Sequence, residues 1–450
     1  MPRLATRTLV LFLFSLLTGL FCAAPAQAQS TFTVNSPGPI DDDNVGDGSC
    51  STFLGSCTLR AAIQEANAST GTTDVIEFSI PSSGTTTISE DITLQITDPV
   101  IIDATTAPAY DGTSPAVILD GASTSASEDG LLLDGAAGSE IRGLAIVNYD
   151  GDGIEIDNSD DAAVYDCFIG LKPDGTAAGN AGNGVYVKSD VDIGNAEGPN
   201  VISRNGVNGI FVSNTAALLS DNIIGLDPDG NVVRPNGQDG VRVAGAGAQV
   251  TIQSSTISGN TESGVVLGGG DNLLTTNVIG LNEARTVARP NERGVLVFSD
   301  NNLIGGNDLI FANVIAGNTS DGIALGSGSN ASSSNTVQYN YIGTDADRGV
   351  FGQNIGLRVA NGSDNTIDAN VVGFNAGGIF VDQDARSTEI TRNYVGVTPN
   401  GFDIGNRKEG IVDEADATSV AEGTKIGLAS AGTSNYVSLN GDGVVVSGQF

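Results

Sequence analysis

Four short stretches with one pattern decide the fold: Asn222-Ile223-Ile224-Gly225, Asn277-Val278-Ile279-Gly280, Asn340-Tyr341-Ile342-Gly343 and Asn393-Tyr394-Val395-Gly396. Each is Asn, two apolar residues and Gly. A second pattern, Gly followed by apolar-x-apolar, alternates with it, as in Gly209-Ile210-Phe211-Val212. The two patterns alternate eleven times between about Leu144 and Val446. A repeat of this length defines the architecture before any single residue does.

The first position of the first pattern predicts a ladder of stacked side chains. It is occupied in turn by Leu144, Cys167, Asn200, Asn222, Ser255, Asn277, Asn313, Asn340, Asn370, Asn393 and Asn435. If one coil takes about 22 residues, as from Asn200 to Asn222, these amides lie at one corner and each donates to the next. Cys167 should then be a small buried side chain rather than a reactive thiol. The Gly of the second pattern is expected to turn a corner with positive φ.

The repeat therefore predicts a parallel β-helix with three short strands per coil. Each strand pairs with its equivalent in the next coil, and eleven coils at about 4.8 Å give a rod near 50 Å long. A leucine-rich horseshoe would need a helix and fixed Leu positions in each repeat, and the repeats have neither. A propeller would need longer antiparallel strands than these short repeats predict.

The coils alternate between short and long, which creates five long turns at 171–183, 226–239, 281–293, 344–355 and 397–409. We expect these turns to project from one side of the rod. They contain eight of the 17 basic residues that follow the first 28 positions, but only ten of the 53 acidic ones. The basic residues are Lys172, Arg234, Arg285, Arg289, Arg293, Arg348, Arg407 and Lys408. They form either a contact surface for an acidic glycan or another copy of the protein, or solvated charges that relieve repulsion.

An acidic turn lies before the repeats, in the sequence Asp41-Asp42-Asp43-Asn44-Val45-Gly46-Asp47-Gly48. Oxygen ligands at alternate positions suit calcium, with Asp41, Asp43 and Asp47 as candidates, although the spacing is not that of an EF-hand. A solvated acidic turn is the alternative. Cys50 and Cys57 follow and are expected to form a disulfide.

The stretch Thr58-Leu59-Arg60-Ala61-Ala62-Ile63-Gln64-Glu65-Ala66-Asn67 predicts a short amphipathic helix, well placed to cover the first open coil. Together with Cys50 and Cys57, it resembles the CSLREA-type N-terminal region of exported bacterial right-handed β-helix proteins. Thr58 and Ala61 stand where the name-giving motif has Ser and Glu. The resemblance implies an exported right-handed β-helix, often near the cell surface, and brings no catalytic residues with it.

The composition and the N-terminal sequence restrict where the protein is located and what it binds. Residues 1–28 read as a secretory signal, with Arg3 and Arg7 before an apolar run and Ala26-Gln27-Ala28 at its end. We expect residues 29–70 to form the disulfide and cap, and residues 71–450 the β-helix. The net charge of −34 disfavours nucleic acid, and no later stretch predicts a transmembrane segment. The chain has no His, the usual general base at neutral pH.

Catalysis is the alternative to binding. The densest acidic group is Asp150, Asp152, Glu155, Asp157, Asp160 and Asp161. Coil geometry brings Asp150 and Asp152, on a turn, beside Glu155 on an outward strand face, with Lys188 or Arg204 on following coils as a base. Such a group would suit a calcium-assisted polysaccharide lyase or a glycoside hydrolase. The sequence favours a structural, adhesive or glycan-binding rod that is exported to the cell surface, the medium or the periplasm.

Overall fold

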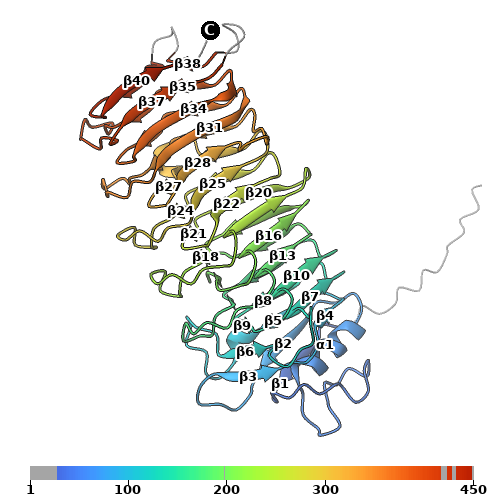
Figure 1. Cartoon of the computed structure of the whole chain (residues 1–450). Helices are drawn as coiled ribbons and strands as arrows, with labels where there is room; N and C mark the ends of the chain where they lie inside the picture. Colours follow the sequence, from blue (N-terminus) through green and yellow to red (C-terminus); the bar gives the residue numbers. More distant parts are fainter. Residues whose placement is uncertain (1–27, 197, 417–422, 428–431, 448–450) are drawn as a thin grey trace, which may run out of the picture.

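The computed structural model describes residues 28–196, 198–416, 423–427 and 432–447. The chain winds into a rod, with the N-terminal segment at one end and the last coils at the other (Figure 1). Its strands pass in strict rotation through three parallel sheets, which is the predicted right-handed β-helix with three strands per coil. Of the predicted signal segment, only Ala28 lies within the described residues.

The three sheets contain 14, 13 and 13 strands. Sheet A consists of β1 (Thr31–Val34), β2 (Asp74–Phe78), β5 (Val100–Asp103), β8 (Glu140–Arg142), β11 (Ala162–Tyr165), β14 (Val191–Ile193), β17 (Ala216–Ser220), β20 (Gln249–Gln253), β23 (Leu273–Thr275), β26 (Leu303–Gly305), β29 (Thr336–Gln338), β32 (Thr366–Asp368), β35 (Glu389–Thr391) and β38 (Lys425–Ile426). Sheet B consists of β3 (Thr86–Ser89), β6 (Val117–Asp120), β9 (Leu144–Val147), β12 (Phe168–Ile169), β15 (Val201–Ile202), β18 (Ile223–Ile224), β21 (Thr256–Ile257), β24 (Val278–Ile279), β27 (Val314–Ile315), β30 (Tyr341–Ile342), β33 (Val371–Val372), β36 (Tyr394–Val395) and β39 (Tyr436–Val437). Sheet C consists of β4 (Leu94–Ile96), β7 (Leu131–Asp134), β10 (Ile154–Asp157), β13 (Val185–Val187), β16 (Ile210–Ser213), β19 (Val241–Ala244), β22 (Ser263–Leu267), β25 (Arg293–Val297), β28 (Asp321–Leu325), β31 (Ile355–Ser363), β34 (Gly377–Arg386), β37 (Glu409–Asp413) and β40 (Asp442–Val446).

The core is a column of β-branched and aliphatic side chains that repeats from coil to coil. On sheet B the inward position is isoleucine in eight successive coils, with each residue directly opposite the next. These residues are Ile146, Ile169, Ile202, Ile224, Ile257, Ile279, Ile315 and Ile342. All are fully or almost fully buried. Strands of two residues suffice because every strand between β12 and β30 pairs on both sides within the stack.

The predicted amide ladder is present at the corner between sheets A and B. Asn277 Nδ2 donates to Asn313 Oδ1 at 3.0 Å, and Asn313 Nδ2 donates to Asn340 Oδ1 at 2.9 Å. Each Nδ2 also donates to a strand carbonyl of the preceding coil, as Asn313 does to Leu274 O. Cys167 is fully buried at its ladder position, and burial raises the pKa of its thiol to about 12. The prediction that Cys167 is a buried side chain is confirmed.

A second amide ladder, not foreseen from the sequence, lies where the chain enters sheet C. Its members stand three or four residues before the Gly of the second pattern: Asn180, Asn205, Asn236, Asn260, Asn291, Asn318, Gln353, Asn375, Asn406 and Asn440. Asn260 Nδ2, for example, donates to Asn291 Oδ1 at 3.1 Å and Asn291 Nδ2 to Asn318 Oδ1 at 3.1 Å. Two polar corners therefore fix the register of each coil.

The expected reason for the second-pattern glycines is wrong. Gly209, Gly240 and Gly264 do not have positive φ. A Cβ on Gly209 would lie 2.6 Å from the carbonyl oxygen of Gly240, so it is the close approach of successive coils that excludes a side chain. The glycines of the first pattern have positive φ, as at Gly225 (88°) and Gly280 (94°).

The N-terminal coil is covered by helix α1 (Leu59–Ala68), which packs against β1, β2 and β4. Thr58 caps the helix by accepting the Ala61 N–H, and Asn67 pairs with the backbone of residues 95 and 97 at the sheet C edge. Arg60 forms an ion pair with the fully buried Glu90. Burial raises the pKa of Glu90 to about 7, against the opposing effect of Arg60. Two 3₁₀ turns (Ala104–Thr106 and Leu309–Phe311) are the other helical segments in the described residues.

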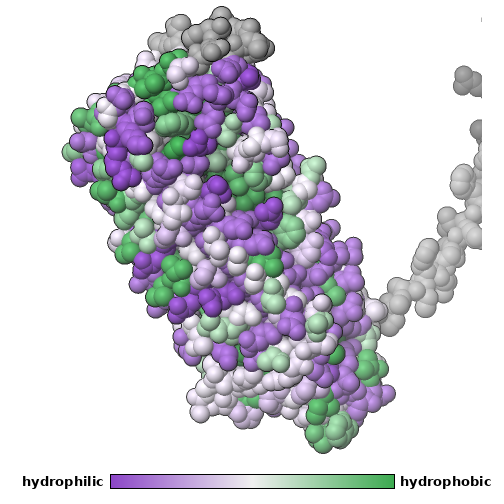
Figure 2. Space-filling model, in the orientation of Figure 1, coloured by the Kyte–Doolittle hydropathy of each residue, from purple (hydrophilic) through white to green (hydrophobic). Residues whose placement is uncertain are grey.

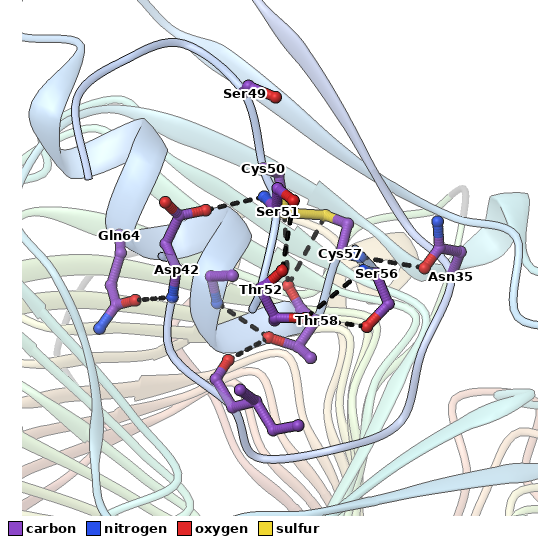
Figure 3. The surroundings of a disulfide bond; sticks show 12 residues. Asn35, Asp42, Ser49, Cys50, Ser51, Thr52, Ser56, Cys57, Thr58 and Gln64 are labelled. Atoms are coloured by element: carbon purple, nitrogen blue, oxygen red, sulfur yellow. Dashed lines mark hydrogen bonds between the residues drawn. A yellow bond between two sulfur atoms is a disulfide. The ribbon is translucent and has the colours of Figure 1, made fainter. Parts of the chain in front are cut away.

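The predicted disulfide joins Cys50 to Cys57 beside this cap (Figure 3). The acidic turn is tied to the helix, because Glu65 accepts the backbone N–H groups of Gly46 at 2.6 Å and Gly48 at 2.8 Å. Disulfide, turn and helix thus form one unit at the start of the rod. No helix within the described ranges combines the length and apolar character required to cross a bilayer.

Candidate functional site

All connections from sheet B to sheet C lie on one side of the rod, which we call the B–C flank. Alternate connections are long, and they protrude along the left side of Figure 1. They follow β12, β18, β24, β30 and β36, as the alternating gaps predict. Four of the five close as small hairpins through one antiparallel bridge, such as Leu226 with Val233.

Three arginines of the B–C flank connect successive long turns. Arg234 Nε donates to Gly175 O in the first turn at 3.3 Å. Arg289 donates to Asn231 O in the second turn. The guanidinium of Arg348 lies 4.2 Å from the ring centroid of Phe402 in the fifth turn. These side chains therefore stack the turns on one another as well as carrying charge.

The remaining candidates on the flank are more open. Arg285, Arg407 and Lys408 are exposed and Lys172 is half-buried. Arg293, at the start of β25, pairs with Glu292 at 3.0 Å. Arg204 lies in a short connection on the same flank, where its backbone N–H donates to Arg234 O. The structure thus places all eight predicted contact residues, and Arg204 as well, along one flank.

Cations differ sharply between this flank and the rest of the molecule. On the B–C flank only Arg293 is within ion-pair distance of a carboxylate in the described part of the chain. The flank cations without such a partner are Lys172, Arg204, Arg234, Arg285, Arg289, Arg348, Arg407 and Lys408. Elsewhere in the described residues Arg386 alone has no ion-pair partner, and ion pairs are formed by Arg60, Arg142, Lys188, Arg242, Arg358, Arg392 and Lys425. In a chain with a net charge of −34, this flank has cations left over for another anion.

The outward face of sheet C is organised differently, with cations paired to acids next to aromatic rings. Tyr186 and Phe211 face outward in register, with ring centroids 5.0 Å apart. Lys188 lies over the Tyr186 ring at 4.5 Å and pairs with Glu155. Burial of Lys188 opposes its charge, but the hydrogen bond that Lys188 donates to Glu155 and the negative charges of Glu155 and Asp157 together outweigh burial and raise the Lys188 pKa.

Three carboxylates meet beside Lys188. One oxygen each of Asp129, Asp152 and Glu155 lies within 4.8 Å of the others, the one such group in the described residues. The sequence predicted Asp152, Glu155 and Lys188 together but missed Asp129, which precedes the regular coils. Asp150, Asp157, Asp160 and Asp161 do not belong to this group. Burial raises the pKa of Asp129 to about 6, and the charges of Asp152 and Glu155 add to the effect.

These three carboxylates form a possible acidic metal-binding group. Asp129 Oδ1 accepts the Asp152 N–H at 2.6 Å, and Asp152 Oδ1 accepts the backbone N–H and the side-chain amide of Asn183. Glu155 is paired with Lys188. Calcium takes six to eight oxygens, so these three side chains would supply part of its coordination.

The acidic turn places its three candidate calcium ligands in separate roles. Asp41 accepts from Gln64 at 3.0 Å, and Asp47 accepts the Ser49 N–H at 2.9 Å and the Asn44 amide at 2.9 Å. Asp43 donates its backbone N–H to Ser51 O. Asp41, Asp43 and Asp47 are not among the carboxylates that the described structure gathers closely enough to share an ion. Calcium at this turn stays a prediction.

Comparison with known proteins identifies the fold family. The family model "Right handed beta helix region" matches residues 109–279 and 229–416. A search of curated proteins gives no match. The crystal structure of the Dettilon tailspike protein has a TM-score of 0.51 and 18% identity, over 78% of this chain and 65% of the tailspike chain, so this chain spans about two thirds of that protein's length. The A-module of an Azotobacter vinelandii mannuronan C-5 epimerase gives 0.46 and 14%, over 93% and 97% of the two chains.

A periplasmic alginate epimerase gives a TM-score of 0.42 at 13% identity, over 80% of this chain and 78% of the other. At such identities the likeness extends to the fold alone. The family model, by contrast, covers well over half of the sequence, from residue 109 to residue 416, and agrees with the three parallel sheets. The chain therefore belongs to the family of proteins with a right-handed β-helix region.

Proposed function

We propose that this protein is an exported, non-catalytic rod that binds an acidic polysaccharide along its B–C flank. One observation carries the proposal: among the residues that the structure describes, eight of the nine cations on that flank have no carboxylate partner, whereas seven of the eight elsewhere do. Guanidinium and ammonium groups that have no carboxylate partner within the described chain remain available for carboxylates of a ligand.

The spacing of the long turns suits a chain-like ligand. Successive long turns are two coils apart, or about 10 Å along the rod. That spacing is comparable to the length of a disaccharide unit, so one polysaccharide chain lying along the flank meets several turns in succession. Several weak contacts on one chain add up through effective concentration.

The strongly acidic remainder of the chain does not prevent this binding. The Debye length is about 10 Å at 0.1 M salt, so the acidic faces on the far side of the rod are largely screened. Contacts within one turn are screened much less. We therefore expect acidic polysaccharide binding to be measurable at moderate salt.

Export is part of the proposal and rests on the N-terminal unit. The Cys50–Cys57 disulfide is the kind of bond that persists in an oxidising compartment. The sequence of residues 1–28 predicts a signal segment, and the cap carries the motif that resembles exported β-helix proteins.

The test is retention on an immobilised uronate polysaccharide, with a neutral polysaccharide as reference. We expect the Arg407→Gln/Lys408→Gln variant to lose about tenfold in affinity, because it removes two unpartnered flank charges. The matched control is Arg386→Gln/Lys425→Gln, which removes the same charge elsewhere and should cost less than about twofold. Equal losses in both variants, or equal retention on the neutral matrix, would contradict the proposal.

A second candidate function is cleavage of the acidic glycan at the carboxylate group on sheet C. The observation in its favour is Asp129, whose raised pKa of about 6 fits a general acid beside the ionised group of Glu155 and Lys188. The assay is product formation from uronate polysaccharides, with and without added calcium, by the native protein and by Asp129→Asn. Turnover that Asp129→Asn abolishes would replace the binding proposal with an enzymatic one.

A further inference from the structure

One gap between the long turns differs from the other three. Arg234 bridges the first and second turns, Arg289 the second and third, and Arg348 the fourth and fifth. Between the tips of the third and fourth turns, all of which the structure describes, there is no hydrogen bond or ion pair. A cavity of about 370 Å³ lies there instead, lined by Ala284, Arg285, Thr286, Asp345, Ala346, Asp347, Arg348, Gly349 and Phe351.

The two turns that flank this cavity also differ at their tips. In all five long turns, the backbone N–H of one tip residue donates to the carbonyl three residues earlier, and that residue has positive φ. It is Gly175, Gly230 and Gly401 in the first, second and fifth turns, with φ of 75°, 61° and 80°. In the third and fourth turns it is Arg285 (57°) and Arg348 (68°).

Arginine is a poor choice for such a position on conformational grounds. Residues other than Gly, Asn and Asp adopt left-handed backbone angles at a cost, and three sister turns use Gly there. Other arginines of this rod, such as Arg204 and Arg392, also have positive φ, so the φ value gains weight only together with the cavity. Here both arginines line the same cavity, and neither has an ion-pair partner in the described residues.

The side chains that line the cavity indicate which chemical groups a ligand there would carry. Arg285 and Arg348 offer planar donors for a carboxylate, while Asp345 and Asp347 offer acceptors for hydroxyl groups. Asp345 is buried and accepts the Gly349 N–H at 2.7 Å, so its position is fixed. Phe351 adds an apolar surface. Two cations balanced by two carboxylates suit a sugar with one carboxylate and several hydroxyls better than a compact dianion.

We propose that this cavity is a subsite for one uronate unit of the bound polysaccharide, with Arg285 and Arg348 holding its carboxylate. The inference rests on the proposed function, since the rest of the polysaccharide would lie along the B–C flank. The cavity volume is within the range of about 300–1,000 Å³ that is usual for small-ligand sites.

The experiment measures binding of a short uronate oligosaccharide by calorimetry, with inorganic phosphate as a second probe. The test variant is Arg285→Gly/Arg348→Gly, which gives both tips the residue of their sister turns and therefore preserves the fold. We expect at least about tenfold weaker oligosaccharide binding in this variant. The matched control is Arg386→Gln/Lys425→Gln, which removes the same charge outside the B–C flank and should change binding of the short ligand by less than about twofold.

Equal losses in the two variants, no loss in the glycine variant, or phosphate binding as tight as the uronate would each overturn the subsite. If the native protein retains the uronate polymer but no short oligosaccharide, the subsite is wrong and the proposed function stands. If it binds neither the polymer nor the oligosaccharide, both are wrong.

Discussion

The corner between sheets A and B and the B–C flank are built from the same side chains and yet behave differently. Both contain an amide ladder, with Asn313 in one and Asn291 in the other. At the A–B corner the ladder residue follows the sheet A strand by two residues in most regular coils, as from Ser220 to Asn222, and longer connections such as that from Gly305 to Asn313 are the exception. On the B–C flank, the ladder residue follows the sheet B strand by three residues in short coils, as from Ile202 to Asn205, but by twelve from Ile224 to Asn236. The second ladder therefore closes the base of each turn and leaves its length free.

The largest expected effect comes from breaking either ladder. Asn313→Ala removes donors to Leu274 O and Asn340 and the acceptor of Asn277, all buried. We expect a loss of about 3–4 kcal/mol in the free energy of unfolding, measured by urea denaturation. Asn291→Ala should cost a similar amount, and Asn400→Ala, at an exposed tip, under about 0.5 kcal/mol. A much smaller effect of Asn291→Ala would break the equivalence of the two corners.

The next largest difference in stability is expected between two kinds of glycine on the B–C flank. Gly209→Ala places a Cβ 2.6 Å from a backbone oxygen and 2.7 Å from Ile224, so we expect about 2–3 kcal/mol of destabilisation. Gly401→Ala meets no atom within 4 Å and suffers only from its φ of 80°, which should cost about 1 kcal/mol. Thermal denaturation of both variants checks the order. A larger loss of stability in Gly401→Ala than in Gly209→Ala would show that backbone conformation matters more than the close approach of coils at these glycines.

Neither ladder contains a group that titrates near neutral pH, since burial raises the pKa of the Cys167 thiol to about 12, so pH should act mainly on other parts of the rod, and most clearly on the cap. The pKa of Glu90 is raised to about 7 in the folded protein from 4.5 unfolded. The folded state therefore binds the proton more tightly, and the Glu90 contribution to stability is lost as pH rises from about 4.5 to 7. We expect α1 amides to gain about 1–3 kcal/mol of protection from hydrogen exchange between pH 8 and pH 5.

Glu90→Gln is the control for that measurement. It should flatten the pH dependence of exchange in α1 and leave the pH dependence near Asn313 unchanged. The same slope in α1 with and without Glu90 would assign the effect to another carboxylate.

The smallest effect concerns a turn tip. Arg285→Gly relieves a φ of 57° at an exposed position, and we expect the protein to gain up to about 1 kcal/mol in stability. Arg285→Lys keeps the charge and the strain and should leave stability unchanged. Chemical denaturation of the pair shows whether the side chain is retained at a cost to the fold. A loss of stability in Arg285→Gly would indicate that Arg285 has a structural partner.

The fold was accessible from the sequence because the coil period maps directly onto the three sheets. Asn222 and Asn277 repeat at a constant position before two apolar residues, so their stacking followed from spacing alone. Asn291 and Asn318 were missed because they stand three and four residues before the next Gly, and this small variation hid the second ladder. The glycine at position 209 was misinterpreted because a sequence pattern does not distinguish positive φ from a close approach.

The candidate site was accessible only in outline. Spacing placed Arg285 and Arg348 on one flank and Asp152, Glu155 and Lys188 together. Whether a cation has an ion-pair partner depends on side-chain directions in neighbouring coils, which spacing does not contain. Asp129 lies in an irregular coil, without the repeat that would align it with Asp152.

The hydrogen-bonded base of the long turns has a practical consequence. Asn205 and Asn236 occupy equivalent ladder positions, although they follow the sheet B strand by three and by twelve residues. The loops that precede them are therefore exchangeable without a change in the ladder. A foreign peptide inserted between Ser203 and Asn205, or in place of residues 226–235, should be presented at a defined position along the rigid β-helix. Related rods can therefore acquire different ligands by exchanging these loops while the coils stay the same.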